Sequence, residues 1–316
     1  MFNLTIAKFG WGCSVDIYLL GHLTIDIVVE GEKVRRSLGG TVTFGSLAAL
    51  KHGVRPHIVS KVGTDFPDEY MMFLGKHNID LSGVGISRYL PTTKFKLVYR
   101  SSGDRDLYLL ARCEDILSGD VPLGKIKGNI AVIGPLVGEI PPSVVQEVSE
   151  VASLVVTDLQ GYVRKQLGDK RIVLSSSPEA RLVVSLSDIV HAEVAEARAI
   201  YGNLEPLELA KKLVEDGAGI SLVTLGADGA YVATRQRAFF VPSIPTRVVD
   251  RTGAGDVFTT VFAVEYQRSG DIREASAYAT AAVSFLIEKP GVDGLKDRWE
   301  VRKRAEKLIE NIKELA

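Results

Sequence analysis

Asp250-Arg251-Thr252-Gly253-Ala254-Gly255-Asp256 is the stretch that decides the fold of this chain. Two acidic residues bracket a Thr and two glycines, and an apolar run typical of a helix follows at 257–264. Glycines let backbone N–H groups point inward, and a helix N-terminus adds its positive dipole end, so the loop predicts an oxyanion site. A carboxylate at the end of such a loop would repel the anion beside it. Its presence makes sense if Asp256 takes a proton from a hydroxyl, which then attacks the phosphorus of a bound phosphate. The alternative to an oxyanion site is an ordinary Gly-rich loop that is N-capped by an Asp.

The composition is that of an ordinary globular protein. The 316 residues are 46% hydrophobic and 24% charged, with a formal net charge of −1, so no basic field favours nucleic acid or an anionic membrane. Cys13 and Cys113 lack the spacing of metal ligands or of a disulfide framework, which suits a reducing compartment. No apolar run reaches the ~18 residues that span a bilayer. We expect a cytoplasmic protein that binds neither nucleic acid nor membranes.

Strand-like apolar runs alternate with helix-like stretches along the chain. The runs that predict strands are 17–21, 25–29, 58–62, 130–133, 154–158, 189–190, 221–225 and 230–233. The stretches that predict helices are 43–52, 142–151, 193–201 and 206–216. Because such alternation is typical of βαβ units, we predict an α/β fold in which helices cover both faces of a mostly parallel sheet.

A different pattern appears in the middle of the chain. The segments 94–100 and 106–110 alternate partly between apolar and polar residues around a polar turn at 101–104, which predicts a β-hairpin with one wet face. Together with 28–37, this hairpin would form a small sheet that acts as a lid.

The chain shows no linker, low-complexity tract or internal repeat. We therefore predict one domain over residues 1–316, with lid segments at about 28–38 and 89–112. The first 15 residues are either an unpaired extension or an extra strand.

Two further glycine-containing segments have the composition of ligand-binding loops. Gly39 and Gly40 open a helix-like run, where they let a ligand touch the backbone, and Thr41 or Thr43 would cap the helix. The segment 224–229 ends a strand, which is where ligands bind in open α/β sheets, so it suits a nucleotide. A tight turn is the alternative for the first segment, and a hairpin turn into 231–233 for the second.

Taken in order, these features resemble the ribokinase-like (PfkB) carbohydrate kinase family over residues 16 to about 297. The family's C-terminal signature, Asp-x-Thr-Gly-Ala-Gly-Asp, matches 250–256, and its Gly-Gly pair matches Gly39 and Gly40. The resemblance implies a doubly covered α/β sheet with a β-sheet lid, and transfer of the γ-phosphoryl group of ATP to a hydroxyl with Mg²⁺. Whether the protein also binds a monovalent cation is left open, since only some members of the family have a loop for one.

The resemblance also implies a role for each matched residue. Asp256 would be the general base, and the N–H groups of Gly253, Ala254 and Gly255 would neutralise charge on the transferring phosphoryl group. The residues expected on the nucleotide side are Thr224, Gly226, Gly229, Thr252 and Ser284.

The candidate magnesium ligands are acidic residues in or near these motifs. Glu193 and Glu196 lie where the family has an Asn-x-x-Glu motif linked to magnesium and phosphate; Glu196 matches, and Glu193 replaces the Asn. With Asp250, they are our candidate ligands, because an acidic pair can hold Mg²⁺ through water. A solvated helix face is the alternative.

The acceptor side departs from the sugar-kinase pattern. Asp26 matches the family acid that binds acceptor hydroxyls, since a carboxylate accepts hydroxyl protons. Phe44 stands where many members have an Asn, so the acceptor pocket must differ. Arg164 would clamp a phosphate or a substrate hydroxyl. The full set of candidate substrate-binding residues is Asp26, Gly39, Gly40, Thr41, Phe44, Asp158, Gln160 and Arg164.

The acceptor is predicted from a finer resemblance. Asp-x-Gln-Gly-x-x-Arg at 158–164, Gly134-Pro135-Leu136 with Glu139-Ile140, and the Phe44-type motif are similar to the inositol-kinase-like branch, so we predict a myo-inositol-like polyol or a sugar. A nucleoside kinase is one alternative, since Phe44, Phe95 or Tyr99 could hold a base. A catalytically silent ligand sensor is the other. An exposed lid edge and the family's habit predict a homodimer through the lid.

Overall fold

The central element of the computed structural model is a ten-stranded sheet, and the structure describes residues 15–99 and 105–315. The strands in spatial order are β16 (Lys313–Leu315), β15 (Ala238–Val241), β14 (Ala230–Ala233), β13 (Ile220–Thr224), β12 (Ile189–Glu193), β9 (Leu154–Asp158), β8 (Ile130–Ile133), β1 (Ile17–Leu20), β4 (Pro56–Gly63) and β5 (Asp80–Ser87). Neighbouring strands run parallel from β13 to β5 and antiparallel from β13 to β16. The mostly parallel sheet is thereby confirmed.

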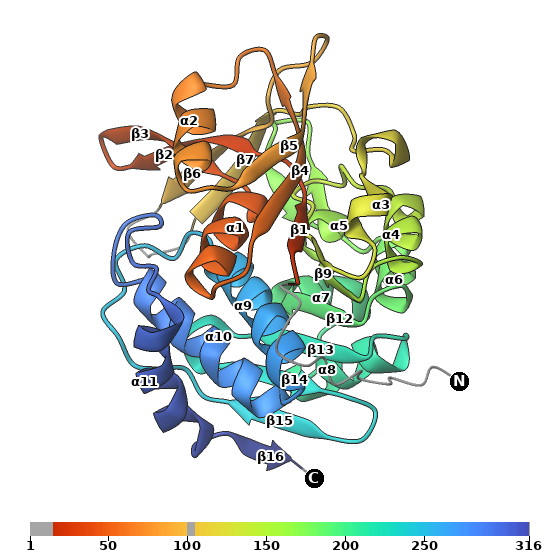
Figure 1. The fold of residues 1–316 in the computed structure, drawn as a ribbon, viewed down its shortest axis with the longest axis vertical. Helices are drawn as coiled ribbons and strands as arrows, with labels where there is room; N and C mark the ends of the chain where they lie inside the picture. Colours follow the sequence, from red (N-terminus) through yellow and green to blue (C-terminus); the bar gives the residue numbers. More distant parts are fainter. Residues whose placement is uncertain (1–14, 100–104, 316) are drawn as a thin grey trace.

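Helices cover both faces of this sheet (Figure 1), and each face has its own apolar core. The helices that contribute buried residues to the first core are α1 (Thr41–Lys51), α2 (Asp68–Lys76), α9 (Ala254–Ser269), α10 (Ile272–Leu286) and α11 (Arg298–Ile309). Those that contribute to the second are α3 (Leu123–Ile126), α4 (Pro142–Ser149), α5 (Gln160–Val163), α6 (Pro178–Ser185), α7 (Val194–Tyr201) and α8 (Pro206–Glu215). Burial of both faces explains why the parallel strands read as continuous apolar runs.

A separate four-stranded sheet forms the predicted lid, at the upper end of the molecule in Figure 1. Its strands in spatial order are β3 (Lys33–Gly39), β2 (Thr24–Glu30), β6 (Lys94–Tyr99) and β7 (Arg105–Ala111). Val28, Phe95, Leu97 and Leu109 pack beneath it against Leu136, because alternate residues of each lid strand face inward.

The lid differs from its predicted extent in one way that matters for the site. We expected it to begin near Val28, but β2 pairs with β3 along its whole length, from Thr24 opposite Gly39 to Glu30 opposite Lys33. Asp26 therefore lies on a lid strand, not on a strand of the main sheet. The predicted turn at 101–104 and the segment 1–14 lie outside the described residues.

Most of the predicted helices and strands are confirmed to within a few residues, whereas five strands were not predicted. The missed strands are β5, β15, β16 and the hairpin of β10 (Arg164–Gln166) and β11 (Ile172–Leu174). The short 3-10 helices are η1 (Ser118–Asp120) and η2 (Gly226–Asp228). None of the helices within the described ranges is long and apolar enough to cross a membrane.

Candidate active site

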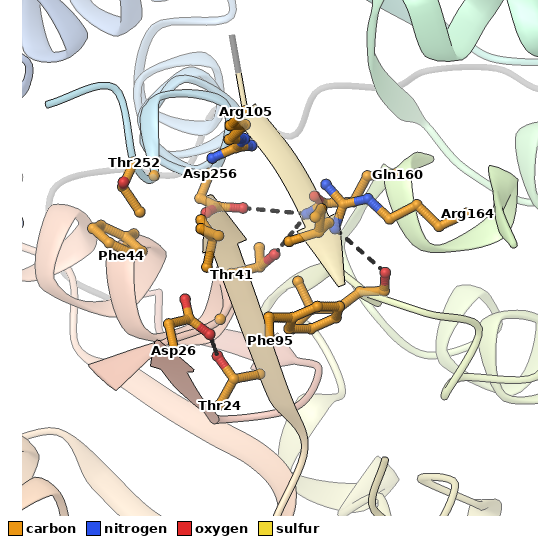
Figure 2. A pocket seen from close by; sticks show the side chains of 15 residues that line it. Thr24, Asp26, Thr41, Phe44, Phe95, Arg105, Gln160, Arg164, Thr252 and Asp256 are labelled. Atoms are coloured by element: carbon orange, nitrogen blue, oxygen red, sulfur yellow. Dashed lines mark hydrogen bonds between the residues drawn. The ribbon is translucent and has the colours of Figure 1, made fainter. Parts of the chain in front are cut away.

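A pocket lies between the lid, the start of α1 and the start of α9 (Figure 2). The space within it is about 470 Å³, including open solvent at its mouth. The residues that line it are Thr24, Asp26, Gly40, Thr41, Phe44, Phe95, Leu97, Arg105, Leu107, Leu136, Gln160, Arg164, Thr252, Gly253 and Asp256. The pocket therefore brings together six of the eight predicted substrate-side residues. The lid and both ends of the Thr252–Asp256 loop meet there as well.

The loop before α9 has the backbone geometry of an anion site. Gly253 is the N-cap of α9 in the left-handed conformation, with φ of 78°, and no side chain caps the helix. A Cβ at Gly253 would stand 2.2 Å from Cδ1 of Phe44, so only glycine fits there. The ring of Phe44 thus packs against the loop before α9 and forms one of its walls, which gives this aromatic residue a structural role.

The N–H groups of the loop differ in one respect from the expected set. The N–H of Ala254 donates to the carbonyl oxygen of Arg251 at 3.2 Å. Within the described chain, the N–H groups of Gly253 and Gly255 have no protein acceptor. These two groups, at the positive end of the α9 dipole, remain available to an oxyanion.

Asp256 lies in the first turn of α9 and points into the pocket (Figure 2). Gln160 Nε2 donates to Thr41 Oγ1 at 3.0 Å and lies 3.5 Å from Asp256 Oδ1. Burial and the charge of Asp158 raise the pKa of Asp256 to about 6, although a hydrogen bond with Thr41 and the charge of Arg164 oppose the rise. A carboxylate with this pKa accepts a proton readily near neutral pH.

Asp26 faces the same pocket from the lid. Thr24 Oγ1 donates to its Oδ1 at 2.7 Å. Burial raises the pKa of Asp26 to about 6, while the bond from Thr24 and the charge of Arg105 lower it. A second carboxylate thus lines the same pocket as Asp256, where it can accept a hydrogen bond from a hydroxyl of a bound molecule.

The Gly39-Gly40 pair is fixed by steric limits. A Cβ at Gly39 would stand 2.1 Å from Asp26 Oδ2, and one at Gly40 would stand 2.2 Å from the carbonyl oxygen of His22. Gly40, with φ of 96°, is the N-cap of α1, and no side chain caps that helix. The expectation that a Thr caps α1 is therefore wrong, because Thr43 Oγ1 donates to the carbonyl oxygen of Gly39 instead.

The strand-end segment 158–164 contributes two residues to the pocket and one residue buried behind it. Gln160 and Arg164 line the pocket, and Arg164 Nη1 donates to the carbonyl oxygen of Leu136 at 3.4 Å. Asp158 is 2% exposed and does not line the pocket. Its Oδ1 accepts the N–H of Gln160 at 2.9 Å, and its Oδ2 bonds to His191 Nδ1 at 2.8 Å. Asp158 therefore bonds to Gln160 and His191 behind the pocket lining, and its substrate-binding role remains a prediction.

The segment 224–229 forms the predicted hairpin turn. The N–H of Leu225 donates to the carbonyl oxygen of Gly229 at 2.8 Å, and β13 pairs with β14 antiparallel. A Cβ at Gly229, with φ of 101°, would stand 2.3 Å from the carbonyl oxygen of Val241. Thr224 lies at the carboxyl end of β13, so a nucleotide role for this turn remains a prediction.

The other two predicted nucleotide-side residues lie apart from each other. Thr252 lines the pocket, and its Oγ1 lies 3.3 Å from the hydroxyl of Tyr99. Ser284 is 3% exposed, and its hydroxyl donates to the carbonyl oxygen of Ala281 and accepts from Arg304. Ser284 is therefore fully bonded within the protein.

The three candidate magnesium ligands have distinct surroundings. Glu196 is buried and accepts the N–H of Glu193 at 2.9 Å in a capping box, while Glu193 itself is exposed. Burial and the charge of Asp158 raise the pKa of Glu196 to about 7. In the described ranges, no group of three or more His, Cys, Asp or Glu side chains could hold a metal by itself.

Asp250, the third of these candidates, anchors the loop. Its Oδ1 accepts the N–H of Thr252 at 2.9 Å, and its Oδ2 accepts the N–H of Gly291 and pairs with Arg35 at 3.3 Å. Although burial acts to raise it, these bonds hold the pKa of Asp250 below its ordinary value. Its carboxylate is thus committed to the loop and the lid.

Sequence reasoning missed several residues of the site. Arg105 reaches into the pocket from β7 (Figure 2), and Leu97 on β6 also lines it, beside Phe95, which sequence had already suggested as a possible contact for a base. The alternation of apolar and polar residues over 94–99 was the sequence signal that could have shown which side chains of β6 face inward. His191 lies beneath the site, and no local motif marks it.

The geometry defines the class of protein: an α/β phosphotransferase with a lid, a helix-terminal anion loop and a buried carboxylate beside it. The chain matches the model of the pfkB family carbohydrate kinases over residues 13–298, and it belongs to that family. It is 27% identical over 285 residues to a cytidine kinase of Thermococcus kodakarensis, covering 88% of this chain and 98% of that protein. It is 25% identical over 290 residues to an inositol 3-kinase of Arabidopsis thaliana, covering 87% and 74%.

The fold is shared with solved kinases. A pyrophosphate-dependent kinase in the ribokinase family, complexed with a pyrophosphate analog and myo-inositol, superposes with a TM-score of 0.78 at 24% identity, covering 91% of this chain and 99% of that one. The protein is thus a PfkB-family phosphotransferase with the ribokinase-like fold. Members of this family phosphorylate sugars, polyols or nucleosides.

Proposed function

We propose that this kinase transfers the γ-phosphoryl group of ATP to a hydroxyl of a small polyol or sugar, with a myo-inositol-like molecule as the acceptor. The observation that carries the proposal is the pairing of Asp256 with free loop N–H groups in one pocket. Asp26 and Arg164 face the same space, so a polyhydroxylated molecule would find an acceptor and a donor of hydrogen bonds around it. The relation to an inositol 3-kinase supports this choice.

The proposed catalytic steps assign one role to each of these side chains. Asp26 accepts a hydrogen bond from one acceptor hydroxyl and fixes its orientation. A second hydroxyl faces Asp256, which takes its proton as the oxygen attacks the terminal phosphorus of ATP; the bond from this phosphorus to the β,γ-bridging oxygen breaks, and ADP leaves with the electron pair. The N–H groups of Gly253 and Gly255 then hold the charge that develops on the phosphoryl oxygens, and Arg164 adds a cation on the acceptor side.

The donor phosphates would reach the anion loop from the side of Thr224. Gly226 and Gly229 keep this turn free of bulky side chains, and the hairpin places Thr224 at the carboxyl edge of the sheet. Because Ser284 is fully bonded, we expect it to shape the adenine pocket without bonding to the nucleotide.

Magnesium would fit at Glu196 and Glu193, in the manner in which Mg²⁺ is held by one or two carboxylates and by substrate phosphates. A nearby cation would favour the ionised form of Glu196, whose pKa burial has raised to about 7. When bound, the metal neutralises phosphate charge. Asp250 is a poorer candidate, since its oxygens are already bonded to Thr252, Gly291 and Arg35.

A nucleoside is the second candidate acceptor. The rings of Phe44 and Phe95 line the pocket and offer apolar surface to a base, and the relation to a cytidine kinase supports this alternative. We place it second, because the ring of Phe44 also packs against Gly253. We further propose that the chain forms a homodimer through the lid.

The test is a substrate panel with the purified protein. Myo-inositol, ribose, fructose, cytidine and adenosine are each incubated with ATP or with pyrophosphate, and phosphorylated product is measured. We expect the highest kcat/KM for an inositol with ATP. Activity only on nucleosides would contradict the acceptor, activity only with pyrophosphate would contradict the donor, and tight polyol binding without turnover would indicate a silent sensor.

A further inference from the structure

His191 lies in the centre of the sheet, directly below the candidate active site. It sits on β12 between β9 and β13, is 1% exposed, and uses both ring nitrogens. Nδ1 lies 2.8 Å from Asp158 Oδ2, and Nε2 lies 3.1 Å from Thr224 Oγ1. Because a carboxylate only accepts, Nδ1 carries the hydrogen, and Nε2 is the atom that meets the hydroxyl of Thr224.

The imidazole also supports the anion loop from below. A Cβ at Gly255 would stand 3.2 Å from Cε1 of His191, so the ring lies against the first turn of α9. On the same helix, the ring of Phe258 lies 6.1 Å from the imidazole, centroid to centroid. A glycine at 255 is what lets the helix N-terminus come this close to the ring.

The two hydrogen bonds of His191 connect the acceptor side of the site with the expected donor side. On one side, Asp158 also accepts the N–H of Gln160, whose side chain reaches Thr41 and lies beside Asp256. On the other side, Thr224 ends the strand that leads into the 224–229 turn. A continuous chain of hydrogen bonds therefore runs from the neighbours of the base to the expected donor side.

We propose that His191 is a positioning residue that fixes the hydroxyl of Thr224 for the phosphoryl donor and links it through Asp158 to the acceptor side. This inference rests on the proposed donor site at the 224–229 turn. A Thr hydroxyl at a strand end has alternative rotamers, and one buried nitrogen at 3.1 Å selects one of them. His191 does not line the pocket, so it acts through the groups that it contacts, which are Thr224, Asp158 and the first turn of α9.

Two substitutions separate the two bonds of the ring. In His191→Asn, the amide nitrogen lies near the position of Nδ1 and can keep the bond to Asp158, but it does not reach Thr224. In His191→Gln, the longer side chain can place its amide near the position of Nε2 and keep the bond to Thr224. We expect His191→Asn to raise the KM for the donor by about 3- to 10-fold, in the range of one lost hydrogen bond, and His191→Gln to keep it within about 2-fold.

A double-mutant cycle tests the same contact from its other end. Thr224→Val removes the hydroxyl with little change of shape, and we expect a similar rise in the KM for the donor. Adding His191→Asn to Thr224→Val should then raise the donor KM by less than about 2-fold further, because the two side chains act through one bond. Fully additive effects on donor KM would overturn the proposal.

A buried histidine elsewhere provides the matched control. His52 is 1% exposed and its Nδ1 lies 2.7 Å from Glu265 Oε1, between α1 and α9 and outside the pocket lining. His52→Asn should lower the melting temperature and leave the donor KM unchanged. If His191→Asn behaves in the same way, the residue is structural and the inference is wrong.

Donor binding to the wild-type protein separates this inference from the proposed function. Calorimetric titration with ATP, and separately with pyrophosphate, is compared between the wild type, His191→Asn and Thr224→Val. If the wild type binds a donor and both variants bind it equally well, the inference fails while the proposed function stands. If the wild type binds neither molecule, the proposed donor site itself fails.

Discussion

At the scale of single residues, the catalytic proposal depends most on the Asp256 carboxylate. Asp256→Asn keeps the size of the side chain and its contact with Gln160, but it cannot take a proton. We expect kcat to fall by ~10²–10⁴-fold, the usual range for general base catalysis, with little change in acceptor KM. Steady-state kinetics at pH 8 measure both constants, and near-normal turnover in the variant would rule out the assigned base.

The raised pKa of Asp256 gives the pH dependence a definite sign. Burial and Asp158 raise this pKa to about 6, and only the deprotonated carboxylate can act as a base. Activity should therefore be low below pH 5, rise through about pH 6, and level off towards pH 8. Asp26 has the same raised pKa, so both groups contribute to this rise. A profile that is flat between pH 5 and 8, with donor and acceptor at saturation, would contradict a base with this pKa.

The residues of the site differ in how far sequence alone could place them. Gly39, Gly40 and Gly253 could be singled out from their motifs, and the structure supplies the reason for glycine, since a Cβ at each would collide with a neighbour. Asp158 ends its strand as predicted, but it is buried outside the pocket lining, and sequence alone does not show to which side a strand-end residue points. His191 carries no local signal, since its partners Asp158 and Thr224 lie 33 residues away on either side.

At the scale of elements, two side-chain contacts between described residues join the lid to the anion loop. Arg35 on β3 pairs with Asp250 at 3.3 Å, and Tyr99 on β6 meets Thr252 at 3.3 Å. Arg35→Gln should raise the acceptor KM by up to about 5-fold, in the range of an exposed ion pair worth at most ~1 kcal/mol. The difference from wild type should shrink in ~1 M salt, because salt screens an exposed pair.

Arg36→Gln is the matched control for the lid contact. It neutralises the next residue of the same strand, whose side chain points to the other face of β3. Acceptor KM and its salt dependence should stay as in the wild type. An equal effect of both substitutions would mean that the general charge of the lid matters, and not the bond to Asp250.

The elements that sequence predicted poorly share a physical cause. β5 contains two glycines and exposed residues, and β16 has only three residues, so neither has a clear apolar period. Both are edge strands that complete the sheet by pairing with a longer neighbour, and only the tertiary context makes them strands. β1, β8 and β9 lie inside the sheet, and their buried residues alone were sufficient to predict them.

At the scale of the whole molecule, the lid leaves an edge strand that a second copy of the chain can cover. β3 ends the four-stranded sheet, and the side chain of Val34 on it is 66% exposed. We expect light scattering to give twice the chain mass, and Val34→Lys to shift the mass towards the monomer. Met72→Lys, which changes an exposed apolar residue on α2 outside the lid sheet, is the control and should leave the dimer intact. A monomeric wild type at tens of micromolar, or equal disruption by both variants, would exclude a dimer through the lid.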